Sequence, residues 1–170
     1  MKIAVALILV ATGCASQRYS TGNPPLLPDR KLTPGAVLQA VTVEQVCAKG
    51  YANVLNGGVR DVSEAEKRRV FSEYFGTVPA NPGDYEVDHL ISLELSGDNS
   101  MSNLWPQSKL THPWNALVKD KLEDRMASLL RQCLAEKGHD AATALMRQFD
   151  QEIAMNWTNA FVRYVGPAPK

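Results

Sequence analysis

The amino-acid sequence predicts an α+β fold, with a single, mostly helical domain that contains one small β-hairpin. Two capping boxes, and long stretches with apolar residues at helical spacing, indicate the helices. A short stretch from Tyr85, in which apolar and polar residues alternate, indicates the strand, and the turn-forming residues 97–100 follow it. The 170 residues suffice for one domain of ordinary size.

The N-terminus has the pattern of a targeting segment, residues 1–13. Lys2 supplies a positive charge, and the apolar run that follows is too short to span a bilayer. Thr12-Gly13-Cys14 then resembles a bacterial lipobox, which implies a signal peptide of the lipoprotein type and a lipidated Cys14. The alternative is ordinary cleavage beside Ala15 without a lipid. Either route exports the chain.

Residues 14–34 are expected to form a tether, because four prolines lie among small polar residues without any periodicity. The folded domain is then expected over residues 35–165, with a short tail at 166–170. Residues 15 and 16 are not acidic, which favours the outer membrane, with the protein facing the periplasm. Without the lipid, the protein would be soluble in the periplasm or secreted.

Two helices are predicted in the first half of the domain from their start and stop signals. A capping box at Thr42 opens a short helix that runs to about Lys49, where Gly50 ends it. A second capping box at Ser63 opens a helix that Gly76 ends. The apolar residues of this second helix fall on one face, as expected of a helix packed on a core.

The second half is predicted to begin with strand and to continue as helix. The strand begins at Tyr85, and Leu93 and Leu95 are expected to continue it beyond a turn. A long helix is expected from Pro113 to near Gly138, and a further helical region follows. The expected inward residues are Trp114, Leu117, Val118, Leu122, Met126, Leu129, Leu130, Leu134, Leu145, Phe149, Ile153, Trp157 and Phe161.

The charge balance restricts how the protein binds a polyanion. Removal of residues 1–13 takes one lysine from the 18 basic residues, which leaves 17 against 18 acidic residues and a net charge of −1. Proteins that bind long nucleic acids without sequence preference are usually basic. Any binding of nucleic acid is therefore expected to come from a local patch.

The cysteines predict a disulfide. With Cys14 assigned to the lipid, Cys47 and Cys133 remain as an even pair in an exported chain. Two buried free thiols are the alternative. A cysteine–metal site is poorly supported, since neither residue has a neighbouring Cys or His at ligand spacing.

One stretch has the order of groups that a family of nucleases requires. Residues 85–97 read YEVDHLISLELSG, residues 103–107 read NLWPQ, and residues 114–123 read WNALVKDKLE. This order resembles the HNH, or ββα-metal, endonucleases, and more narrowly an exported bacterial subgroup. The resemblance implies that the hairpin and the next helix form a ββα-metal motif. It also implies a metal-dependent nuclease that hydrolyses phosphodiester bonds in DNA or RNA.

The resemblance also implies a role for each site residue. His89 would be the general base, and Asp88 would be a ligand of a divalent metal ion. Asn103 would orient His89, either through its side chain or by holding the hairpin. The third position remains open between His112, which the spacing from Asn103 selects, and Asn115, which the helix pattern selects. His112 would favour Zn²⁺ or Ni²⁺, whereas Asn115, the preferred choice, would favour Mg²⁺ or Mn²⁺.

A second function fits the same sequence. The neutral charge and the small ligand set are also consistent with a non-catalytic envelope lipoprotein or binding module that keeps the fold. Lys109, Lys119, Lys121 and Arg125 lie on or beside the site helix and are the expected phosphate contacts. Residues 67–69, Lys-Arg-Arg, are expected to form a solvated helix face.

Overall fold

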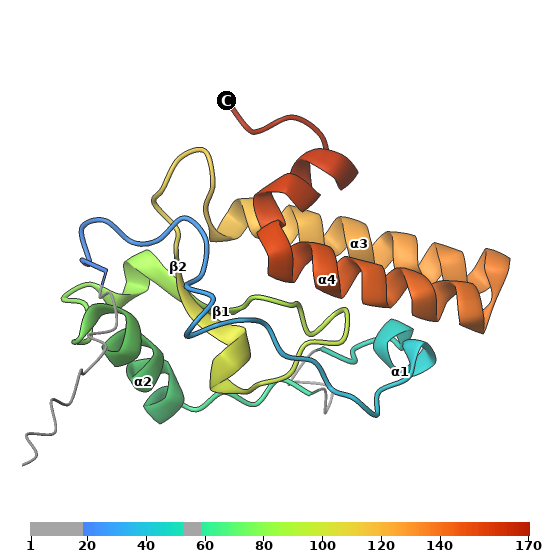
Figure 1. Ribbon diagram of the computed structural model, residues 1–170, viewed down its shortest axis with the longest axis horizontal. Coiled ribbons are helices and arrows are strands. Elements are labelled where there is room, and N and C mark those ends of the chain that lie inside the picture. The colour runs from blue at the N-terminus through green and yellow to red at the C-terminus, as the bar shows by residue number, and fades with distance from the viewer. Residues whose placement is uncertain (1–18, 53–58) are drawn as a thin grey trace, which may run out of the picture.

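Helices and one small sheet make up the computed structural model, which describes residues 19–52 and 59–170 (Figure 1). The α+β class is therefore confirmed, with four α-helices and one two-stranded antiparallel sheet in these residues. The elements in chain order are α1 (Val43–Cys47), α2 (Glu64–Phe75), β1 (Tyr85–His89), β2 (Leu104–Ser108), α3 (Ala116–Lys137) and α4 (His139–Tyr164).

Both predicted capping boxes are present at the starts of α1 and α2. The Thr42 hydroxyl accepts a hydrogen bond from the backbone N–H of Gln45 at 3.3 Å, and the Gln45 side chain accepts one from the N–H of Thr42 at 2.9 Å. Ser63 and Glu66 make the same exchange at 3.2 and 2.7 Å. Gly76 ends α2 with a positive φ of 75°, as its position predicts.

The hairpin pairs β1 with β2, so the second strand is not where the alternation placed it. Asp88 lies opposite Trp105 and His89 opposite Leu104 in the antiparallel register. Leu93 and Leu95 lie instead in the irregular connection between the strands, where both are almost completely buried. Their apolar character reflects burial within this connection, so the prediction of strand at these residues was wrong.

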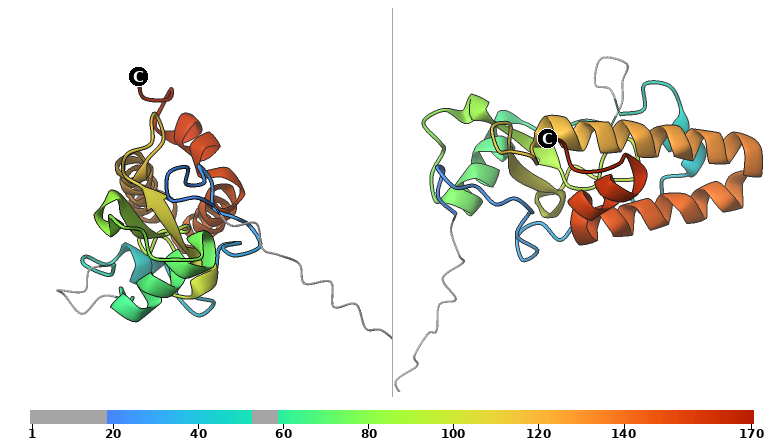
Figure 2. Two further views of the ribbon diagram at one scale, coloured as in Figure 1. Left: turned by 90° about the vertical axis from the view of Figure 1, so that its left-hand side faces the viewer. Right: turned by 90° about the horizontal axis from the view of Figure 1, so that it is seen from above.

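The helices α3 and α4 run side by side and form the helical layer of the molecule (Figure 2). Their facing apolar side chains join the core of the hairpin and α2. Asn115 caps α3, which begins at Ala116, slightly after the predicted start at Pro113. Leu117, predicted to face inward, is 61 % exposed because it lies on the outer side of the first turn.

Residues 19–34 pack against the domain, although the sequence suggested a free tether. Tyr19 stacks on Tyr74, with ring centroids 5.9 Å apart. Thr33 is completely buried, and its hydroxyl donates a hydrogen bond to the Leu104 carbonyl at 2.8 Å. Residues 19–34, the described part of the expected tether, are therefore part of the folded domain.

The structure does not describe the predicted targeting segment at the N-terminus. The targeting segment 1–13 and Cys14 lie outside the described residues. None of the helices within the described ranges has the length and apolarity needed to cross a membrane.

The predicted disulfide between Cys47 and Cys133 is not formed in this structure. Both residues are free, half-buried thiols, on the packed helices α1 and α3.

Candidate functional site

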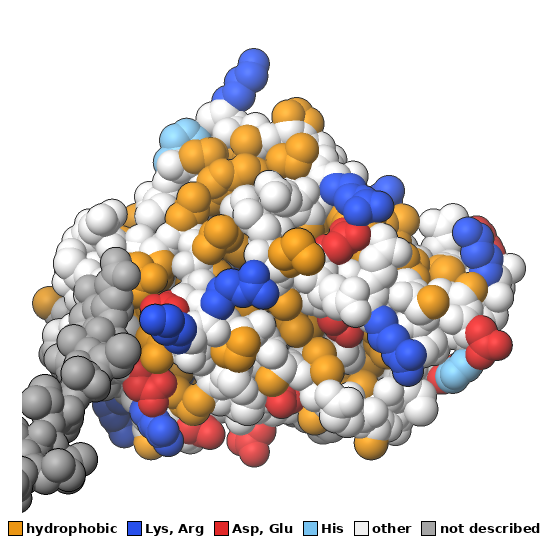
Figure 3. All heavy atoms as spheres, in the orientation of Figure 1, with side chains coloured by type: hydrophobic (Ala, Val, Ile, Leu, Met, Phe, Trp, Pro, Cys, Tyr) orange, Lys and Arg blue, Asp and Glu red, His pale blue; other side chains and the backbone are white. Residues whose placement is uncertain are grey.

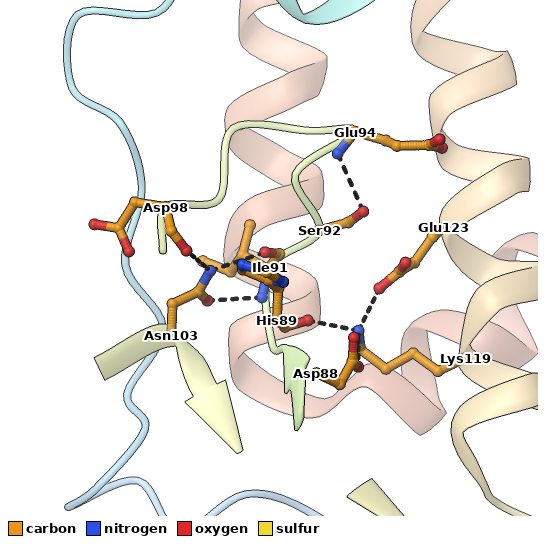
Figure 4. Close-up of polar contacts among 9 residues, drawn as sticks. All are labelled: Asp88, His89, Ile91, Ser92, Glu94, Asp98, Asn103, Lys119 and Glu123. Carbon is orange, nitrogen blue, oxygen red and sulfur yellow. Dashed lines mark hydrogen bonds and ion pairs between the residues drawn. The ribbon is translucent and has the colours of Figure 1, made fainter. Parts of the chain in front are cut away.

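The motif residues gather where the end of β1 meets α3 (Figure 4). Successive side chains of a strand point to opposite faces, so neighbouring residues of β1 reach different surroundings. Asp88 is directed to α3, where it meets Lys119. His89 is directed to the connection between the strands, where it meets Asn99.

Asp88 belongs to a buried ion cluster with Lys119 and Glu123. The Lys119 ammonium donates hydrogen bonds to Asp88 Oδ2 and to the His89 carbonyl, both at 2.7 Å, and a further one to Glu123. Burial opposes the charge of Lys119, but the two carboxylates raise its pKa above the ordinary value. Lys119 therefore joins α3 to β1, and it is not a free phosphate contact, contrary to the prediction.

Asn99 fixes the tautomer of His89. The Asn99 Nδ2 donates a hydrogen bond to the Val59 carbonyl at 2.7 Å, and its Oδ1 accepts one from the backbone N–H of Asp61 at 3.3 Å. The same Oδ1 lies 2.9 Å from His89 Nε2. Because an amide oxygen only accepts, Nε2 carries the hydrogen, and Nδ1 of the neutral ring carries the lone pair.

The Nδ1 atom of His89 is buried and has no hydrogen-bond partner among the described residues. The residue is only 2 % exposed. Burial, the strongest influence, lowers its pKa, which the Asn99 hydrogen bond and Asp88 partly offset. The imidazole is therefore neutral near pH 7, which is the form that accepts a proton.

His89 lines a hollow of about 670 Å³, here called the His89 hollow. This volume lies within the range of small-ligand pockets. Part of its wall consists of Arg60, Phe71, Glu86, Val87, His89 and Lys109.

Asn103 holds the connection between the strands and has no hydrogen bond to His89. Its Oδ1 accepts from the Ile91 N–H at 2.9 Å, and its Nδ2 donates to the carbonyls of Ile91 and Asp98 at 3.0 and 2.8 Å. The backbone of Gly97 packs tightly against Ile91 in the same connection. A Cβ added at Gly97 would lie only 1.9 Å from the Ile91 carbonyl oxygen, so a larger residue would displace this packing. Asn103 therefore holds the connection of the hairpin, and any influence on His89 would act through the hairpin.

Two of the three predicted metal ligands are engaged in other contacts, and the third is exposed. Asp88 Oδ2 is paired with Lys119. Both polar atoms of Asn115 are engaged at the start of α3, because Oδ1 accepts from the Val118 N–H at 3.0 Å and Nδ2 donates to the Thr111 carbonyl at 3.0 Å. His112 is exposed on the connection before α3. No group of three or more His, Cys, Asp or Glu side chains is placed to hold a metal ion in residues 19–52 and 59–170.

Sequence reasoning missed two of the residues that shape this site. Asn99 was recognised only as part of the turn at 97–100, and Lys119 only as one of several basic residues near the site. The available signal for Asn99 was a polar residue ten positions after His89, within the predicted turn, but neighbouring polar residues of the turn fit the same description. The Val59 carbonyl that holds the Asn99 side chain lies 40 residues away, and Lys119 lies 31 residues from Asp88, in contacts that no local pattern encodes.

Comparison of the chain with models of protein families, with curated proteins and with solved structures gave no match. Evidence on function therefore comes from the motif and from the geometry of the site. The most specific feature of the site is the His89 ring, whose Nε2 is paired with Asn99 and whose Nδ1 has no partner among the described residues.

Proposed function

We propose that the protein is a nuclease of the HNH type, which hydrolyses phosphodiester bonds in DNA or RNA with His89 as the general base. One observation carries the proposal: the neutral ring of His89 has its hydrogen fixed on Nε2, and its Nδ1 has no hydrogen-bond partner in residues 19–52 and 59–170. A base needs a free lone pair in a fixed orientation. The Asp-His pair and the downstream Asn103 add the order of groups seen in the family that the sequence resembles.

The proposed reaction needs a water molecule beside His89 Nδ1, and because this atom is buried here, a local opening of the His89 hollow must admit that water. His89 Nδ1 takes a proton from this water while the water oxygen forms a bond to phosphorus. The bond from phosphorus to the leaving oxygen breaks, and the leaving oxygen keeps its electron pair and takes a proton from solvent. Asn99 keeps the ring in place and supports the imidazolium through its Oδ1. The resemblance implies a divalent metal ion, but the engaged ligands give no basis for assigning it a step.

The proposed setting is the cell envelope. Cys14 would carry a lipid that anchors the domain to the outer membrane on its periplasmic side. If the chain is cleaved without a lipid, the same domain would act in the periplasm or outside the cell.

A second candidate function is a non-catalytic envelope or binding module with the same fold. Two observations favour it. The His89 ring is almost completely buried, so water does not reach Nδ1 in this conformation. The pairing of Asp88 with Lys119 also resembles a structural link more than an open ligand.

Cleavage assays separate the two candidates. The full-length chain, purified in detergent, would be incubated with plasmid DNA or single-stranded RNA in the presence of Mg²⁺, Mn²⁺, Zn²⁺, Ni²⁺ or EDTA. A nuclease cleaves at least one substrate in at least one condition. Folded protein that leaves both substrates intact in every condition would contradict the proposal and favour the binding module.

A further inference from the structure

Basic side chains from three separate segments border the His89 hollow. Arg60 precedes α2, Lys67 and Arg68 lie on α2, and Lys109 follows β2. The acidic residues of the lining are Glu64 and Glu86. The segments converge because α2 packs against the hairpin (Figure 1).

Three of these basic side chains are available to a ligand. Lys67 pairs with Glu64 at 2.6 Å, so their charges offset each other. Within residues 19–52 and 59–170, Arg60, Arg68 and Lys109 form no ion pair. Burial, followed by the nearby Asp88 and Asp120, raises the pKa of Glu86, the remaining carboxyl of the wall.

The neighbouring hollow on the α3 side shares Arg60 with the His89 hollow but is more acidic overall. This hollow of about 830 Å³ is lined by four acidic side chains against three basic ones. The acidic residues are Glu94, Asp120, Glu123 and Asp124. On the face shown in Figure 3, basic and acidic side chains are interspersed. With a net charge of zero for the whole chain, local charge decides where a polyanion binds.

We propose that Arg60, Arg68 and Lys109 hold the backbone phosphates of a nucleic-acid strand in the His89 hollow, so that the strand approaches over α2. This inference rests on the proposed function and adds the substrate path to it. It differs from the path along α3 that Lys121 and Arg125 suggested in the sequence. Arg69, beside Arg68, pairs with Glu73 at 2.9 Å and does not line the hollow, which makes it a matched control.

The salt dependence of binding tests the proposed path. The full-length chain carrying His89→Ala, which prevents turnover, would be titrated in EDTA with a fluorescent single-stranded DNA of about 20 nucleotides at several salt concentrations. Each phosphate contact contributes a slope of about −0.7 to the logarithm of the binding constant against the logarithm of salt. Arg60→Gln, Arg68→Gln and Lys109→Gln should each flatten the slope by about 0.7. Arg69→Gln and Lys121→Gln should leave it unchanged.

The outcomes separate this path from the nuclease activity itself. If the slope flattens for the three hollow variants and not for Arg69→Gln or Lys121→Gln, the path is supported, even if the wild-type chain cleaves nothing. Cleavage by the wild-type chain together with unchanged slopes, or with flattening by Lys121→Gln, overturns the path and leaves the nuclease intact. Absence of DNA binding at low salt also overturns the path.

Discussion

At the scale of single residues, different neighbours set the tautomer and the pKa of His89. Asn99 fixes the hydrogen on Nε2 through a 2.9 Å contact. Burial lowers the pKa below that of a free imidazole. The neutral base therefore persists to more acidic pH than an exposed histidine would allow, and we expect the acidic limb of the cleavage rate below pH 6.5.

Substitutions of Asn99 test this arrangement through the pH profile of kcat/KM. Asn99→Asp keeps an acceptor for Nε2–H but adds a negative charge, which raises the pKa of His89 and moves the acidic limb to higher pH. Asn99→Ala removes the acceptor and should lower the plateau rate, because the ring is no longer fixed in one tautomer. The exposed Asn159→Ala is the control. Identical profiles for wild type and both Asn99 variants would refute the positioning role.

The sequence identifies some site residues and misses others for a physical reason. Asp88, His89 and Asn103 stand in one short motif, so local order singles them out. Asn99 depends on the Val59 carbonyl, 40 residues away, and Lys119 contacts Asp88 across 31 residues. Those contacts exist only once the chain has folded.

At the scale of elements, the helices could be predicted because their signals are local. The capping boxes of α1 and α2 and the glycine at the end of α2 are formed as the sequence indicates. The strand β2 was harder to predict, because Pro106 lowers the strand propensity of its five residues. A proline is tolerated there because both strands of a two-stranded sheet are edge strands.

The link between α3 and β1 gives a prediction for stability. Lys119→Met would leave the carboxylates of Asp88 and Glu123 partly buried without their cation, and it should lower the free energy of unfolding by about 3–5 kcal/mol. The exposed Lys121→Met on the same helix should change it by less than about 0.5 kcal/mol. Urea unfolding followed by circular dichroism measures both. Equal stability of the two variants would show that the cluster does not join the elements.

At the scale of the whole molecule, one buried carboxyl ties α4 to the connection between the strands. Asp150 accepts a hydrogen bond from the Ser96 hydroxyl at 2.6 Å, while its other oxygen is buried without a partner among the described residues. Burial, partly opposed by the Ser96 hydrogen bonds, raises its pKa from 3.8 to about 6. The folded state therefore favours the protonated form. The stability that protonated Asp150 contributes to the folded state is fully present below pH 3.8 and is lost as the pH rises through about 6.

Asp150→Asn tests this contribution across pH. The shift from 3.8 to about 6 corresponds to about 3 kcal/mol, so the neutral amide should stabilise the protein by up to about that amount at pH 7.5 relative to its effect at pH 4. The difference in unfolding free energy between variant and wild type, measured in urea at both pH values, gives the result. The exposed Asp124→Asn is the control. If Asp150→Asn changes stability equally at both pH values, the carboxyl does not titrate as described.

Anchoring of the whole protein gives a separate prediction. Cys14→Ser removes the only thiol of the lipobox-like sequence, so it should release soluble protein or block processing. Membrane fractionation with labelled fatty acid distinguishes these results from the wild-type pattern. Unchanged fractionation without incorporated lipid in the wild type would indicate ordinary cleavage.

Chemical rescue of His89→Ala tests the central claim most directly. Removal of a general base commonly lowers the rate by about 10² to 10⁴. Imidazole added to the variant can enter the His89 hollow and supply the missing nitrogen base. We predict that His89→Ala stays folded, loses cleavage by at least about 10² and regains part of it with increasing imidazole. A His89→Ala variant that cleaves at the wild-type rate without imidazole would contradict the assignment of His89 as the base.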